Sequence, residues 1–121
     1  MDTKENITLL TTIPICALGN KSREYLAALD VEQLISSEDG LRRDYRGIAD
    51  MFEFAPSTLR AIERSTSPMS DILDLIGDKK LAKLIDCLER IGRFDVLDDL
   101  QESMIDDALS YQQKVSQLPG M

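Results

Sequence analysis

The sequence predicts an all-α fold built from six short helices. Apolar residues recur at positions i, i+3, i+4 and i+7, most regularly between Leu81 and Ile91, which is typical of a helix with one buried face. Proline and glycine residues divide these patterns into short segments, and the alternation typical of strands is scarce. The chain of 121 residues suits one domain, and its 43% hydrophobic content is enough to form a small core.

The first predicted elements are an arm and a helix. We expect residues 1–17 to form a loose N-terminal arm, docked on the body of the domain through a few apolar side chains. These are Ile13, Ile15 and Leu18. Asn20 is predicted to cap the first helix, because its side chain can accept a hydrogen bond from the helix start. The apolar face of this helix comprises Tyr25, Leu26 and Leu29.

The second and third helices follow a predicted turn at residues 36–40, with Leu34 and Ile35 continuing the first helix after a bend. The apolar face of the second helix is formed by Tyr45, Ile48, Ala49 and Phe52. Gly47 lies inside this helix at a cost of about 1 kcal/mol relative to alanine, which indicates a close contact with another helix there. Pro56 suits the first turn of a third helix, whose apolar residues are Leu59 and Ile62.

Ser67 and Pro68 predict the start of the fourth helix, as a cap residue followed by proline at the first helical position. Its apolar residues are Met69, Ile72, Leu73 and Ile76, and Gly77 ends it. Asp78 is predicted to cap the fifth helix, which Gly92 ends. A sixth helix runs from about Asp95, with Leu97, Leu100, Met104 and Ala108 on one face. The predicted domain thus spans residues 18–111, and residues 112–121 form a frayed tail.

Composition excludes several classes of function. The net charge of −8 makes nucleic acid an unexpected partner, because binding to it depends on neutralising phosphates with lysine and arginine. The same charge argues against an anionic membrane surface, and no apolar run is long enough to span a bilayer. The two cysteines, Cys16 and Cys87, are expected to be free thiols in a reducing compartment.

The sequence offers no convincing catalytic site. The chain has no histidine, so serine–histidine and cysteine–histidine arrangements are impossible. No glycine-rich phosphate loop is present, and we expect no metal and no cofactor. The last helix carries the acids Asp98, Asp99, Glu102, Asp106 and Asp107. Paired carboxylates can hydrolyse glycosides, but a run of acids on an amphipathic helix is typical of a solvated face.

Charge sorting is the remaining signal. Basic residues form three groups: Arg42, Arg43 and Arg46; Lys79, Lys80 and Lys83; and Arg90 and Arg93. Acids gather at Asp71 and Asp74 and along the last helix. Two interpretations stay open. The charges either form an ordinary solvated surface with i, i+4 pairs, or form opposed patches that dock onto other proteins.

Two stretches resemble a known family. Residues 39–54, DGLRRDYRGIADMFEF, resemble the second-helix region of a death domain, with Tyr45 in the position of the usual tryptophan. Residues 84–100, LIDCLERIGRFDVLDDL, are similar to the fifth and sixth helices of one subfamily. That subfamily is the myeloid differentiation primary response adaptors of Toll and interleukin-receptor signalling. The resemblance covers roughly residues 13–111.

The chain departs from that family at three places. Tyr45 replaces a core tryptophan, and Ile76 stands where many relatives carry a second one, so the chain has no tryptophan. The link from Gly77 to Leu81 is shorter than in vertebrate-type adaptors, which points to an invertebrate-type member. Full-length adaptors also carry a TIR domain, so we expect this chain to be one domain of a longer protein.

The resemblance implies a six-helix antiparallel Greek-key bundle with no catalytic activity, acting in the cytoplasm. Such domains assemble into helical oligomers through unequal surfaces that meet head to tail. The implied partners are death domains of a downstream kinase or of a bridging adaptor, and further copies of the same chain are possible. The implied contact residues are Arg90, Arg93 and Asp95 at an exposed corner, Asp50 and Glu53, Arg60 and Glu63, and Asp71 and Asp74. On this interpretation Arg93→Glu leaves the fold intact and weakens assembly.

Three rival functions remain at this point. One is a helical nucleic-acid binder, although the charge argument predicts no binding in an assay at physiological salt. The chain could be the death domain of the kinase or bridging adaptor itself, although the Gly-Arg corner argues against that. It could also be an enzyme that uses the acidic last helix, which would require a hydrolytic activity lost on Asp→Asn changes there.

Overall fold

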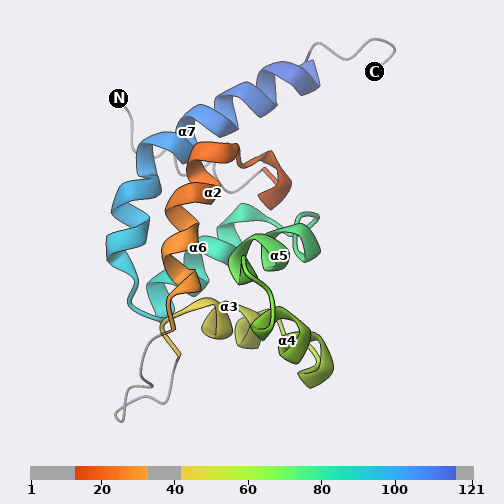
Figure 1. Cartoon of the computed structure of the whole chain (residues 1–121). Coiled ribbons are helices and arrows are strands. Elements are labelled where there is room, and N and C mark those ends of the chain that lie inside the picture. Colours follow the sequence, from red (N-terminus) through yellow and green to blue (C-terminus); the bar gives the residue numbers. More distant parts are fainter. Residues whose placement is uncertain (1–12, 33–41, 117–121) are drawn as a thin grey trace.

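The computed structural model describes residues 13–32 and 42–116. This part of the chain is all-α: it contains six α-helices and two short 3₁₀ helices, and no strand (Figure 1). The α-helices are α2 (Asn20–Leu26), α3 (Tyr45–Met51), α4 (Pro56–Glu63), α5 (Pro68–Leu75), α6 (Leu81–Arg90) and α7 (Phe94–Ser116). The 3₁₀ helices are η1 (Ile15–Ala17) and η2 (Ala27–Asp30). The predicted helix bend at Leu34 and Ile35 and the predicted turn at 36–40 lie outside the described residues.

The helices form a bundle around one core. The long α7 runs beside α2, whereas α4 lies at the opposite end of the bundle and packs on α5 (Figure 1). Each α-helix contributes buried apolar side chains, and Tyr45 is only 1% exposed. The predicted apolar faces are confirmed, with Tyr25, Phe52, Leu59, Ile85 and Leu97 packing at the edge of the core. The apolar periodicity therefore identified the buried side of every helix.

The described end of the arm is docked through its backbone as well as its side chains. Ile13, Ile15 and Leu18 are buried, as predicted. The amide of Ile15 donates to the carbonyl of Lys79 at 2.8 Å, and the amide of Leu81 donates to the carbonyl of Ile13 at 3.0 Å. These bonds hold the arm against the connection between α5 and α6.

Two predicted caps are wrong, because backbone groups and distant side chains already satisfy the helix starts. Gly19, not Asn20, precedes α2, and its amide donates to the carboxylate of Asp107 on α7 at 2.9 Å. Lys80, not Asp78, precedes α6, whose first amide is bound by the arm. Asp78 is exposed and lies 3.9 Å from the ammonium group of Lys79.

The start of α5 was placed correctly, but not the group that caps it. Pro68 is the first helical residue, and Asp71 lies in the first turn, as predicted. The side chain of Ser67 makes no capping bond. Instead, the amide of Met69 donates to the carboxylate of Asp30 at 2.8 Å, so η2 supplies the cap.

Gly92 acts as predicted, whereas the closest contact at Gly47 is with the segment before α3 rather than with another helix. At Gly47, an added Cβ would collide with the backbone oxygen of Arg42, so only glycine allows this approach. Gly92 ends α6 with φ +74°, a conformation that favours glycine. The amide of Gly92 donates to the carbonyl of Glu89 and that of Arg93 to the carbonyl of Leu88, which together form a Schellman motif.

The last helix is longer than predicted. It starts at Phe94 and continues to Ser116, past Gln112, where the sequence placed the start of the tail. No glycine or proline interrupts residues 94–116, so the backbone has no local reason to leave the helix there. None of the described helices has the combination of length and apolar character needed to cross a bilayer.

Candidate interaction surface

The turn between α6 and α7 is the first of the predicted contact regions. The guanidinium group of Arg93 makes two bonds to the carboxylate of Asp95, from Nε at 3.1 Å and from Nη2 at 3.2 Å. Its Nη1 donates to the backbone carbonyl of Arg43 at 2.5 Å. The side chain of Arg93 is therefore only 12% exposed, and the prediction that it is an exposed charge is wrong. Asp95 is 65% exposed, as expected.

The hydrogen bonds of this turn also affect acid–base behaviour. The pKa of Asp95 is lowered, chiefly because Arg93 donates hydrogen bonds to its carboxylate, and secondarily because of the positive charge of Arg93. Arg90, the last residue of α6, is exposed and makes no ion pair with any described residue. The turn thus presents the exposed guanidinium group of Arg90, which pairs with none of the described residues, and the exposed carboxylate of Asp95, which stays ionised at neutral pH.

The predicted residues of α3 lie at its C-terminal end. Asp50 is exposed and faces Arg42, with 3.9 Å between its Oδ2 and the Nε of Arg42. Glu53 follows the helix and is exposed, with φ +59°. This positive φ lets the chain turn from α3 towards α4.

The predicted residues of α4 and α5 lie on two helices that pack against each other. Arg60 and Glu63 are exposed on α4. Asp71 and Asp74 both line an open hollow of about 310 Å³ between α4 and α5. Its remaining lining residues are Thr58, Ala61, Ile62 and Leu75. In the structure, Asp71 and Asp74 thus lie beside apolar side chains in the same hollow. The sequence alone did not indicate this arrangement, because it depends on how α4 and α5 pack.

Asp74 also has a partner on another helix. Arg23 of α2 donates from Nη2 to Asp74 at 3.0 Å, and to the hydroxyl of Ser70 at 2.9 Å. The carboxylate of Asp74 is still 68% exposed. An exposed ion pair of this kind contributes little to stability, so a partner could replace Arg23 at small cost. Because its carboxylate is mostly exposed, Asp74 remains accessible to such a partner.

Four surface features were missed in the sequence. Phe94 and Leu75, which the sequence analysis left out of the apolar faces, are both large apolar side chains that are 56% exposed. Phe94 directly precedes the predicted contact residue Asp95, and Leu75 directly follows Asp74. Arg43 and Asp30 were not identified as partners of helix ends, because their contacts are 48 and 39 residues away in the sequence.

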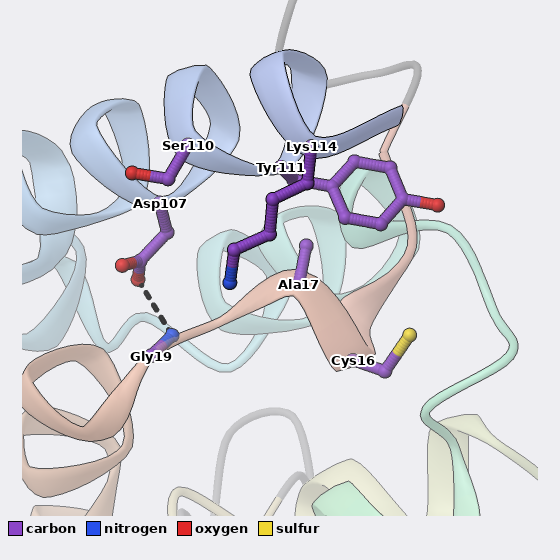
Figure 2. A pocket seen from close by; sticks show the side chains of 7 residues that line it. All are labelled: Cys16, Ala17, Gly19, Asp107, Ser110, Tyr111 and Lys114. Carbon is purple, nitrogen blue, oxygen red and sulfur yellow. Dashed lines mark hydrogen bonds between the residues drawn. The ribbon is translucent and has the colours of Figure 1, made fainter. Parts of the chain in front are cut away.

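A second hollow, of about 320 Å³, lies between η1 and α7 (Figure 2). Its lining residues are Cys16, Ala17, Gly19, Asp107, Ser110, Tyr111 and Lys114. Asp107 points towards the start of α2, where its carboxylate accepts a hydrogen bond from the Gly19 amide (Figure 2). It also accepts one from the Ser22 hydroxyl, at 2.5 Å. The carboxylate of Asp107 is therefore used in hydrogen bonds within the domain, unlike the carboxylates of the exposed acids of α7.

Little in the described part of the chain suggests catalysis or metal binding. No three cysteine or acidic residues there are grouped so as to hold a metal ion. Asp98, Asp99, Glu102 and Asp106 are exposed along α7, as a solvated face requires. Cys16 is exposed, whereas Cys87 is buried among α-helices, and burial raises the pKa of the Cys87 thiol.

Comparisons with known proteins leave the family open. No family model matches the chain, and no solved structure gives a significant match.

Proposed function

We propose that this chain is a non-catalytic adaptor domain of the death-domain type, which assembles with other death domains into an oligomeric innate-immune signalling complex. The observation that carries the proposal is the separation of surface from core. The apolar faces of all six α-helices are used in one core, while α3, α4, α5 and the α6–α7 turn each present exposed charges. Such a molecule has its binding groups on the outside, on several faces.

The positions of the family-like motifs support this proposal. The described part of the first motif contains α3, where Tyr45 is buried in the core at the position that tryptophan usually takes in death domains. The second motif falls on α6, the Gly92 turn and the start of α7. We accordingly propose the antiparallel Greek-key arrangement of death domains for the six helices, and the cytoplasm as the place of action.

The proposed partners are death domains of a downstream kinase or a bridging adaptor, with further copies of this chain as a possible addition. Unequal patches on different faces favour head-to-tail contacts, which build open helical assemblies rather than closed dimers. Exposed charges such as Arg90, Asp74 and Asp95 would set partner choice and association rate. Assembly would concentrate attached kinases so that they phosphorylate one another.

Light scattering after size-exclusion chromatography tests the proposal. The domain is run alone and mixed with a purified kinase-type death domain, at low and at high salt. We expect a large complex in the mixture that becomes smaller as salt screens the charged contacts. A monomeric domain in every run would contradict the proposal.

A charge-matched pair of variants makes the test specific. Asp71→Asn combined with Asp74→Asn neutralises the acidic rim of the α4–α5 hollow, while the new amide oxygen at position 74 can still accept from Arg23. Asp98→Asn combined with Asp99→Asn removes the same charge from the solvated face of α7. We expect only the first pair to reduce assembly, and equal behaviour of the two pairs would remove the hollow from the proposed interface.

A further inference from the structure

Two arginines interlock the α6–α7 turn with the segment that leads into α3. Arg43 donates from Nη1 to the carbonyl of Ile91, the residue that ends α6, at 3.2 Å. In return, the backbone carbonyl of Arg43 accepts the bond from Nη1 of Arg93. One residue of the α3 segment thus holds the turn through its side chain and through its backbone.

Gly92 lies under this arrangement. An added Cβ at Gly92 would lie 2.5 Å from Nη1 of Arg43, so the guanidinium group packs directly on the glycine. A cation at this place also suits the negative end of the α6 dipole. The residue after Arg43 is anchored as well, because Asp44 is fully buried and lies 2.6 Å from Nη2 of Arg46. The interlock therefore ties the turn to a rigid part of α3.

Besides Arg90 at the end of α6, the accessible groups of the turn are the two residues after Arg93. Phe94 is 56% exposed and Asp95 is 65% exposed, against 12% for Arg93. We propose that Arg43 and Arg93 are positioning residues, which hold Phe94 and Asp95 in place as the contact groups of this turn. The inference rests on the proposed function only in assuming a partner that meets the turn, and its test requires no partner.

Fluorine NMR of the whole chain, labelled with fluorophenylalanine, tests the positioning role. The chain has three phenylalanines, Phe52, Phe54 and Phe94, so one signal reports on the turn. Arg43→Met removes the guanidinium group, and Arg93→Lys keeps the charge but loses the paired geometry. Arg42→Met is the position-matched control, because Arg42 pairs with Asp50 rather than with the turn.

We expect Arg43→Met and Arg93→Lys each to shift or broaden the Phe94 signal, and Arg42→Met to leave it unchanged. Combining the two changes should add little to either one, because they break the same interlock. An unchanged Phe94 signal in both single variants would overturn the inference, and so would fully additive effects. Should Arg43→Met fail to fold, Arg93→Lys alone decides between these outcomes.

Binding then separates this inference from the proposed function. If the parent domain captures a kinase-type death domain, we expect Arg93→Lys to weaken capture by roughly tenfold, as for loss of a well-ordered charged contact. If capture were weaker while the Phe94 signal stayed in place, Arg93 would contact the partner directly, and the inference would be wrong. If the parent domain captured no partner but the Phe94 signal still moved in the variants, the proposed function would be wrong and the positioning role would be supported.

Discussion

At the scale of single residues, the α6–α7 turn shows how a charged side chain can be held within a surface loop. Arg93 bonds the Asp95 carboxylate on one side and a backbone carbonyl on the other. Both acceptors favour a cation, so this guanidinium group is tightly held although it lies in a loop. A Glu at this position would face the Asp95 carboxylate and leave the Arg43 carbonyl without its donor. With these bonds in view, we expect Arg93→Glu to destabilise the turn as well as to weaken assembly.

The acid titration of Asp95 should report on this turn. The folded-state pKa of Asp95 is lowered by the bonds from Arg93, so its stabilising contribution is present above the unfolded pKa of about 3.9. That contribution is lost as the pH falls through the lower, folded-state pKa. We expect NMR titration of the Asp95 carboxyl to give a pKa below the usual value. In Arg93→Lys the pKa should move back towards it, and an unchanged titration would contradict the bidentate contact.

The two cysteines should differ in reactivity. Cys16 is exposed, whereas Cys87 is buried and its pKa is raised by burial, which reduces its thiolate fraction at neutral pH. We expect an aromatic disulfide reagent to modify one thiol per folded chain and two in denaturant. Cys16→Ser should abolish the reaction of the folded chain, and rapid labelling of that variant would show that α6 opens readily.

At the scale of elements, helix ends are satisfied by groups far away in the sequence. Asp30 of η2 caps α5, and Asp107 of α7 binds the start of α2. These contacts fix how pairs of helices meet, because a cap is useful only when both elements are in place. The α5 side of the acidic hollow therefore depends on η2.

Replacing either candidate cap of α5, the adjacent Ser67 or the distant Asp30, should show which of the two stabilises the start of the helix. Asp30→Ala removes the carboxylate that accepts from the Met69 amide, at an expected cost of about 1 kcal/mol in the free energy of unfolding. Ser67→Ala is the control, because Ser67 occupies the cap position without making the bond. Urea unfolding of both variants measures the difference. A larger loss in Ser67→Ala would show that the local hydroxyl caps the helix after all.

The same contrast explains what the sequence can and cannot predict here. Apolar periodicity located every helix and its buried side, because burial depends on spacing along one element. The caps at Asn20 and Asp78 were wrong, because local patterns cannot reveal that the arm or α7 already satisfies those amides. The exposure of Phe94 was missed for a related reason: the first residue of α7 lies beyond the core that the rest of the helix covers.

The candidate surface followed the same rule. Exposed acids such as Asp74 could be identified from their positions on an amphipathic helix. The hollow between α4 and α5 could not, because it depends on how two helices pack. The burial of Arg93 depends on Arg43, which is 50 residues earlier in the chain. Side chains that act alone were therefore easier to predict than side chains that act in pairs.

At the scale of the whole molecule, one core is shared by all six helices and the docked arm. Leu84 on α6 is 1% exposed and belongs to the same cluster as residues of the arm and of α7. A molecule with one shared core is expected to unfold in a single cooperative step. Its surface can then vary without loss of the fold, which suits a domain that interacts through charged patches.

Two identical changes, one inside and one outside the core, test this organisation. Leu84→Ala should lower the free energy of unfolding by about 2–5 kcal/mol, because it removes buried contacts and leaves a cavity. Leu109→Ala makes the same change at a side chain that is 46% exposed on α7, and should stay within about 0.5 kcal/mol of the parent. Urea unfolding followed by circular dichroism measures both. Since the core is shared, the loss in Leu84→Ala should also be the same when reported by the Phe94 fluorine signal, whereas separate transitions would mean that the turn unfolds independently of α6.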